Sequence, residues 1–172
     1  MGIEMPAPAK PEGVNAAVWE KMLSATPVEA RHLIREGEFT APTSGLCPGY
    51  AQANLIVLPR EQAYDFLLFA QRNPKPCPLL EVTETGARET TICATDCDIA
   101  TDFPRYRIYE YGKLVDEVAD VSSYWRDDLV SFVIGCSFSF ESELIEAGIE
   151  MRHNTQGRNV SMYLTNVACT PA

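Results

Sequence analysis

Residues 50–72 read YAQANLIVLPREQAYDFLLFAQR and change from the pattern of a strand to that of a helix at Pro59. The part before Pro59 ends in a continuous apolar run, which is typical of a strand covered on both faces of a sheet. The part after it, residues 60–72, places apolar side chains at helical spacing on one stripe, with an acid in the first turn and a base in the last. A further short apolar strand at 79–83 completes a strand–helix–strand unit and predicts an α/β fold.

The C-terminal part of the chain predicts a second junction between a strand and a helix. Residues 129–134, LVSFVI, are typical of a buried strand, with a helix as the alternative for so short an apolar run. The turn GCSFS at 135–139 follows, and Ser139 is expected to cap a helix over 140–147. Residues 159–167 are then expected to return as a strand.

The segment between these two units is expected to form a small β-rich insertion at residues 84–120. Its first part, residues 84–100, is polar and irregular. Residues 105–110 and 113–117 flank Tyr111-Gly112 and predict a β-hairpin.

The N-terminal region predicts a tail and two short helices. Residues 1–13 are rich in proline and are expected to be a flexible tail. Asn15 is a suitable cap for the first helix, and Thr26-Pro27-Val28-Glu29 has both ends of a capping box for the second. We therefore place the main α/β portion in residues 14–83 and 121–172.

Charge and hydrophobicity limit the class of partner. The 172 residues carry 14 basic and 24 acidic side chains, a net charge of −10, so nucleic acid and anionic membrane surfaces are poor partners. No apolar run approaches the roughly 18–20 residues of a spanning helix. The first residues lack the pattern of a signal peptide, and a cytoplasmic location is expected.

Six cysteines in a chain without an export signal predict reduced thiols rather than disulfides. Cys93 and Cys97 are four residues apart, but they lack a second short-spaced pair and a nearby histidine. We therefore expect no metal site, since structural zinc usually requires paired ligand spacings, and we expect no cofactor.

The GCSFS turn is the first candidate site. Backbone N–H groups at a helix N-terminus can hold an anion or oxyanion. Cys136 and Ser137 are candidate nucleophiles by position, although the turn lacks the G-x-S-x-G pattern. The alternative is that small residues are needed here for close packing of strand against helix, and packing with anion binding is favoured over covalent catalysis.

Only two histidines are available for proton transfer near neutral pH. His153 lies in the polar turn MRHNTQGRN and is the better candidate, with a structural loop histidine as the alternative, whereas His32 lies within a helix. The other candidate proton carriers are Tyr50, Lys75, Tyr106 and Glu141, and nothing in the sequence ranks them.

Basic side chains in turn-rich segments of an acidic chain suit a pocket for a small carboxylate, because arginine offers two parallel donors to it. The alternative is that each arginine pairs with a surface acid. The candidate residues for binding the substrate are Thr43, Ser44, Gln52, Asn54, Arg72, Arg105, Cys136, Ser139, Arg158 and Asn159.

Five runs of sequence also carry a family resemblance. TSGLCPGYAQANLIVLP, DFLLFAQRNPKPCPLLEVT, TDFPRYRIY, WRDDLVSFVIGCSFSFESELIEAGI and GRNVSMYLTN occur in this order. From about Arg31 to its end, the chain resembles the bacterial "putative hydro-lyase" family related to mitochondrial D-glutamate cyclase. The resemblance implies a mixed-sheet, three-layer α/β main portion with a smaller α+β portion, and carbon–oxygen lyase chemistry.

The chain differs from that family in three places. It has Ala41 where glycine is usual and Leu164 where a basic residue is usual, and it ends at Ala172, before a further segment that similar proteins contain. A truncated sheet would present an exposed edge that favours association, so a homo-oligomer is one expectation.

Two functions from different classes follow. The first is a hydro-lyase that removes water from a small carboxylate, most concretely by closing D-glutamate to 5-oxo-D-proline, with His153, Tyr50, Lys75 and Ser137 as candidate catalytic residues. The second is a non-catalytic binder of small carboxylates or an inactive truncated remnant.

Overall fold

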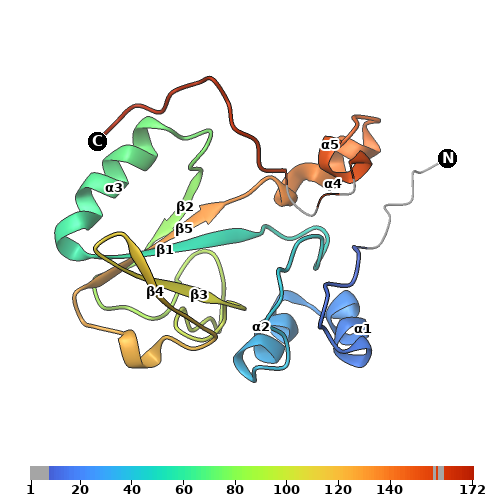
Figure 1. The fold of residues 1–172 in the computed structure, drawn as a ribbon, viewed down its shortest axis with the longest axis horizontal. Helices are drawn as coiled ribbons and strands as arrows, with labels where there is room; N and C mark the ends of the chain where they lie inside the picture. Colours follow the sequence, from blue (N-terminus) through green and yellow to red (C-terminus); the bar gives the residue numbers. More distant parts are fainter. Residues whose placement is uncertain (1–7, 157, 159–160) are drawn as a thin grey trace.

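The computed structural model describes residues 8–156, 158 and 161–172. The elements, in chain order, are α1 (Ala16–Ser24), α2 (Pro27–Arg35), β1 (Ala53–Pro59), α3 (Arg60–Arg72), β2 (Leu79–Val82), β3 (Tyr106–Glu110), β4 (Lys113–Val118), the 3-10 helix η1 (Ser122–Tyr124), β5 (Leu129–Gly135), α4 (Phe138–Glu146) and α5 (Arg152–Thr155) (Figure 1). The mixture of helices and sheets confirms the predicted α/β class.

In the described part of the chain, the main sheet has three strands in the order β1-β5-β2, and both neighbouring pairs are antiparallel. Strand β5 is buried from Leu129 to Ile134 because it has a strand on each side and a layer on each face, so it can be apolar throughout. Strand β1 was expected to be equally buried, and this expectation is wrong. Among the residues that the structure describes it pairs with β5 on one side only, and its residues alternate between half-buried and exposed positions up to Ile56.

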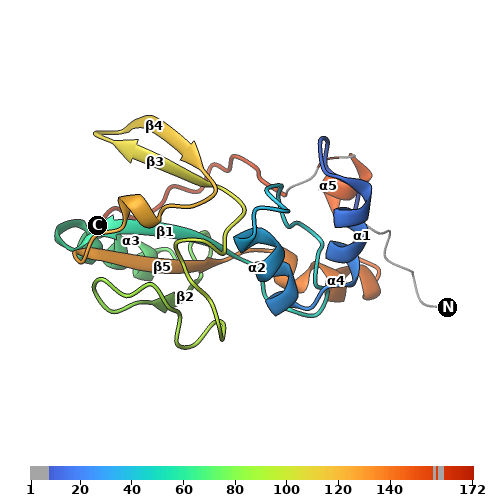
Figure 2. The ribbon, with the colours of Figure 1, turned by 90° about the horizontal axis from the view of Figure 1, so that it is seen from below.

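The main sheet lies between helix α3 and the insertion. On one face, Phe132 of β5 meets Phe66 of α3 edge to face, with ring centroids 4.8 Å apart. On the other face, Leu55 of β1 packs against a cluster that includes Tyr106 and Val121. Figure 2 shows the β3–β4 hairpin standing to one side of the sheet.

The hairpin of the insertion forms as predicted. Strands β3 and β4 pair antiparallel, with a register shift between Ile108 and Tyr109. Tyr111 and Gly112 connect the strands with φ values of 49° and 77°, the left-handed backbone that two-residue hairpin turns require.

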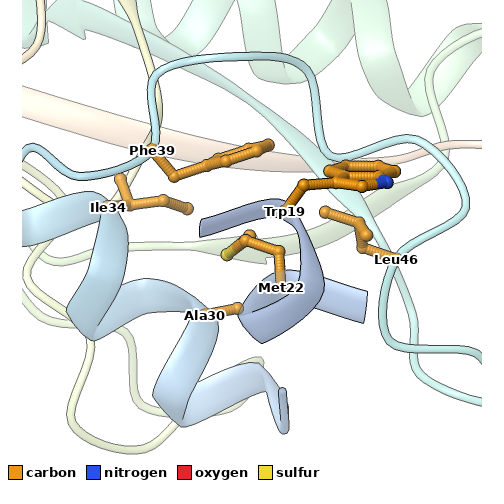
Figure 3. Packing of buried hydrophobic residues seen from close by; sticks show 6 residues of the cluster. All are labelled: Trp19, Met22, Ala30, Ile34, Phe39 and Leu46. Atoms are coloured by element: carbon orange, nitrogen blue, oxygen red, sulfur yellow. The ribbon is translucent and has the colours of Figure 1, made fainter. Parts of the chain in front are cut away.

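Helices α1 and α2 have a hydrophobic core of their own. Its buried residues are Trp19, Met22, Ala30, Ile34, Phe39 and Leu46 (Figure 3). Both predicted caps are confirmed. The Asn15 side chain accepts from the backbone N–H of Ala17, and the reciprocal hydrogen bonds of Thr26 and Glu29 complete the capping box.

The junction after β5 differs from the expectation. Helix α4 begins at Phe138 rather than near residue 140, and Ser139 is not its cap. The Ser139 hydroxyl instead accepts a hydrogen bond from the backbone N–H of Gln52, at 3.0 Å. A long-range partner therefore displaced the local capping role that the sequence favoured.

The expected strand over residues 159–167 is also wrong for the part that the structure describes. Residues 161–167 form no strand ladder there. The segment runs from the region of α5 toward the end of α3 (Figure 1), where the Asn73 side chain both accepts from the Thr170 N–H at 2.8 Å and donates to the Thr170 carbonyl at 2.7 Å. Within the described residues, no helix has the length and apolar character to cross a bilayer.

Candidate functional site

A wide cleft of about 2130 Å³ lies along β1, bounded by the β3–β4 hairpin, the loop around residues 40–44 and the start of α4. The antiparallel pairing of Ala53 with Gly135 brings the start of β1 beside the end of β5. The Cys136 N–H consequently donates to the Gln52 carbonyl at 3.3 Å. Two segments more than 80 residues apart in the sequence therefore meet at one end of the cleft.

Many of the sequence-predicted site residues line this cleft. They are Thr43, Ser44, Gln52, Asn54, Lys75, Arg105, Cys136 and Ser137. The structure therefore gathers the hydroxyls of one loop, the amides at the start of β1 and the GCSFS turn around one hollow.

A buried carboxylate stands behind the cleft wall at the start of α4. Glu141 lies four residues after Ser137, so the two side chains share one face of the helix. The Ser137 hydroxyl donates to Glu141 Oε1 at 2.7 Å, and the Ser161 hydroxyl donates to the same oxygen at 3.1 Å. The two hydroxyl oxygens are 2.7 Å apart.

His153 completes this cluster from the opposite side of Glu141. Its Nε2 lies 3.1 Å from Glu141 Oε2, and its ring meets Phe138 edge to face. The exposed fractions of His153 and Glu141 are 3% and 8%. Ser137 and Ser161 line the cleft, whereas Glu141 and His153 are not among the lining residues.

This cluster of Ser137, Glu141, His153 and Ser161 can move a proton. A hydroxyl at the cleft surface can give its proton to the buried carboxylate and take one from a bound molecule. The second carboxylate oxygen stays in contact with His153, which fixes the orientation of Glu141. The arrangement suits general acid–base chemistry on a group placed beside Ser137.

The sequence analysis selected two members of this cluster, Ser137 and His153, as candidate catalytic residues. It did not select the other two, Glu141 and Ser161. Glu141 was one of several unranked proton carriers, and Ser161 was not singled out. The spacing of Ser137 and Glu141 on one helix was a usable signal for Glu141. Ser161 lies 24 residues after Ser137 and 20 after Glu141, and no local pattern in the sequence predicts a contact over that distance.

Cys136 is placed for packing rather than for nucleophilic attack. Its thiol donates to the Gln52 carbonyl at 3.3 Å. Burial raises the pKa of this thiol above its ordinary value, so the thiolate is disfavoured near neutral pH.

The predicted arginines do not gather at the cleft. Arg105 lines it, but Arg105 and Arg107 both pair with Glu117, at 2.7 and 2.9 Å. These two guanidinium groups lower the pKa of the Glu117 carboxyl. Arg72 instead donates to the Pro171 carbonyl at 2.6 Å. The pairing of Arg105 with a surface acid matches the alternative that the sequence left open.

The remaining candidates lie elsewhere or cannot be placed. Tyr50 is 58% exposed and Arg158 is exposed, and neither lines the cleft. The Ser139 side chain is directed to the backbone of Gln52. Asn159 lies outside the described residues.

Lys75 is the cation at the cleft whose charge is available to a ligand. Within residues 8–156, 158 and 161–172, the ion pairs involve other basic side chains. The same residues contain no group of three or more His, Cys, Asp or Glu side chains placed to hold a metal ion.

Comparison with known proteins gives consistent matches. The family model described as D-glutamate cyclase matches residues 130–172. A protein of Clostridium beijerinckii named "Putative hydro-lyase" is 61% identical over 146 residues, which cover 85% of this chain and 56% of that protein. "Putative hydro-lyase YcsI" of Bacillus subtilis is 58% identical over 146 residues, or 85% of this chain and 57% of the relative. The chain therefore spans a little over half the length of these curated relatives.

Proposed function

We propose that the cleft of this chain removes water from a small carboxylate. The premise is that the chain belongs to the family whose members are named "Putative hydro-lyase". The observation that carries the proposal is the cluster of Ser137, Glu141, His153 and Ser161 at the cleft wall. Elimination of water needs a group that accepts a proton and a group that returns one to the departing oxygen. A hydroxyl backed by a buried carboxylate can do both in turn.

The most concrete substrate is D-glutamate, which would close to 5-oxo-D-proline. The amine nitrogen forms a bond to the side-chain carboxyl carbon, and one carbon–oxygen bond of that carboxyl breaks. The ammonium group loses two protons, and the departing oxygen takes up two and leaves as water. In this scheme Ser137 passes a proton from the nitrogen to Glu141, and the same pair returns a proton to the oxygen.

Lys75 has a binding role in this scheme. An ammonium group at the cleft neutralises a carboxylate of the substrate, which makes attack on that carboxyl, or loss of its oxygen, less costly. The amides of Gln52 and Asn54 and the hydroxyls of Thr43 and Ser44 line the same cleft and can bind the polar groups of the substrate.

The first prediction concerns Glu141. We expect the purified protein to release 5-oxo-D-proline from D-glutamate, measured by chiral chromatography, and we expect Glu141→Gln to lower kcat by about 100-fold or more, since general acid–base groups contribute roughly 10²–10⁴-fold. The matched control is Glu143→Gln, an exposed carboxylate on the same helix, which should leave kcat unchanged. A Glu141→Gln variant with full activity would contradict the proposed relay.

The second candidate function is a non-catalytic binder of small carboxylates. It is favoured by one observation, that Lys75, the amides of Gln52 and Asn54 and the hydroxyls of Thr43 and Ser44 line one cleft and can bind a carboxylate without any proton transfer. Thermal denaturation with and without D-glutamate separates the two functions. A rise in Tm with no product formed supports a binder, because a ligand at 100 times its Kd stabilises by about 2.7 kcal/mol.

A further inference from the structure

Ser161 has two hydrogen-bond acceptors within reach of its one hydroxyl hydrogen. Glu141 Oε1 lies 3.1 Å from the Ser161 oxygen, and the Ser137 oxygen lies 2.7 Å from it. A hydroxyl hydrogen rotates about the bond that carries it, so it can point to either acceptor while the oxygen atoms stay in place. Ser161 can therefore exchange a proton with Ser137 or with the carboxylate.

The three oxygen atoms of this group can hold a changing number of protons. Two hydroxyls and an ionised carboxylate have two hydrogens for three contacts. The two contacts of 2.7 Å have the usual length of a hydroxyl hydrogen bond, whereas the contact of 3.1 Å between Ser161 and Glu141 is longer. A third proton, taken up by Glu141, has this longer contact available to it. The group can thus gain and lose a proton without moving its oxygen atoms.

Both hydroxyls open to the cleft. Ser137 and Ser161 are among the residues that line it, whereas Glu141 is 8% exposed and is not. The two hydroxyl oxygens can therefore contact one bound molecule together, with the carboxylate behind them.

The spacing of the two hydroxyls matches two atoms of the reacting group. Once the amine nitrogen of D-glutamate has bonded to the side-chain carboxyl carbon, that carbon carries both the nitrogen and the departing oxygen. Two atoms on one tetrahedral carbon are about 2.4 Å apart, given single bonds of about 1.46 Å. Hydroxyl oxygens 2.7 Å apart can each bind one of these two atoms.

We propose that Ser161 is a second catalytic residue, which returns the proton to the departing oxygen while Ser137 takes it from the nitrogen. This role rests on the proposed elimination of water. Ser137 accepts a proton from the nitrogen and gives its own to Glu141 Oε1, Glu141 gives a proton to Ser161, and Ser161 gives its own to the oxygen. All three side chains then hold their original number of protons.

This relay accounts for every proton and electron pair of the reaction. It runs twice in a turnover, because the ammonium nitrogen loses two protons and the departing oxygen gains two. The carbon–nitrogen bond forms with the electron pair of the amine, and the carbon–oxygen bond breaks with its pair leaving on the water.

An ester of the substrate separates the roles of the two hydroxyls. The alcohol of a D-glutamate γ-trifluoroethyl ester leaves with little help from an acid, whereas the nitrogen must still lose its protons. We expect Ser161→Ala to lower kcat with D-glutamate by about 100-fold or more, but to stay within about tenfold of the wild type with the ester, after correction for the uncatalysed rate. Ser137→Ala should be slow with both substrates. Activity with the ester also shows that the Ser161→Ala protein is folded.

Two further variants serve as controls. Ser161→Thr keeps a hydroxyl and should retain kcat with D-glutamate within about tenfold. Thr165→Ala removes an exposed hydroxyl from the same segment and should leave both rates unchanged.

The results that overturn this role differ from those that contradict the proposed function. Equal losses of Ser161→Ala with both substrates, or a raised KM with kcat unchanged, would exclude a role in returning the proton. Full activity of Ser161→Ala with D-glutamate would overturn the second catalytic hydroxyl alone. A wild-type protein that forms no 5-oxo-D-proline from D-glutamate would contradict the proposed function and this role together.

Discussion

Glu81 shows how a single side chain can organise an irregular loop. It is 4% exposed, and its carboxylate accepts from the backbone N–H groups of Thr91, Ile92 and Cys93 and from the Thr91 hydroxyl. Burial opposes ionisation of this group, but the hydrogen bonds outweigh burial and hold its pKa at about 2. The irregular first part of the insertion is therefore attached to β2 through one ionised carboxylate.

The loss of this carboxylate should destabilise the fold in a pH-dependent way. We expect Glu81→Gln to lower the free energy of unfolding at pH 7 by roughly 1.5–3 kcal/mol, because the amide nitrogen cannot accept the N–H groups that the carboxylate bound. The folded pKa is lower than the unfolded one, so this stabilisation is present above about pH 4.5 and is lost as the pH falls toward 2.

Urea unfolding between pH 7 and pH 2.5 measures this effect. The wild-type protein should lose stability over that range more steeply than Glu81→Gln does. Glu84→Gln, an exposed acid two residues beyond β2, is the control and should change stability by less than about 0.5 kcal/mol. Equal pH slopes in the wild type and Glu81→Gln would show that the carboxylate is not ionised as described.

Helix α2 depends on its own capping residues. The capping box of Thr26 and Glu29 satisfies two N–H groups that the first turn leaves free, and these hydrogen bonds lower the pKa of Glu29. We expect Thr26→Ala to cost about 1 kcal/mol in urea unfolding. Ser24→Ala, at the end of α1, is the control, because its hydroxyl contacts carbonyls that already belong to a helix.

Helix α2 is joined to the insertion through an ion pair whose carboxylate is buried. The Asp102 side chain is fully buried, and both its oxygens accept from Arg35, each at 2.7 Å. The hydrogen bonds of Asp102, with its charge, raise the pKa of Arg35 above its usual range. The same carboxylate accepts from the Asp98 N–H, so it also fixes the loop from which it comes.

Removal of the Asp102 charge should separate these two elements. We expect Asp102→Asn to cost about 1–3 kcal/mol, because the amide nitrogen cannot accept the hydrogen bonds that the buried carboxylate takes from Arg35 and from the Asp98 N–H. Hydrogen exchange should accelerate in α2 and in residues 95–102 before it changes in β5. Asp128→Asn removes the exposed pair with Arg126 and should cost less than about 1 kcal/mol; a similar cost for both variants would contradict the role of burial.

Local signals explain which elements the sequence could predict. The capping box, the apolar run of β5 and the Tyr111-Gly112 turn each depend on residues close together in the chain, and all three were predicted correctly. Ser139 was assigned as a helix cap from its local position. Its actual partner, Gln52, is 87 residues away, and no local pattern indicates a contact over that distance. The same limit applies to the candidate site, where Ser137 and His153 were selected but their common partner Glu141 was not ranked.

At the scale of the whole molecule, the residues that the structure describes form separate hydrophobic cores. Helices α1 and α2 enclose one core, the α3 face of the sheet forms a second, and the insertion forms a third on the opposite face. The cleft lies among these parts, so its walls come from segments that belong to different clusters. This division could not be read from composition, because the number of apolar residues does not say how they are distributed among clusters.

The attachment of Thr170 to Asn73 has a consequence for how the sequence can vary. The carboxamide of Asn73 also donates to the Phe69 carbonyl, and at Thr170 its hydrogen bonds are to the main chain, as those of a neighbouring peptide group would be. The side chain at position 170 can therefore change freely without loosening the attachment. Proline is the exception, since it has no amide hydrogen to offer, and at that one position it would leave the Asn73 oxygen without its donor.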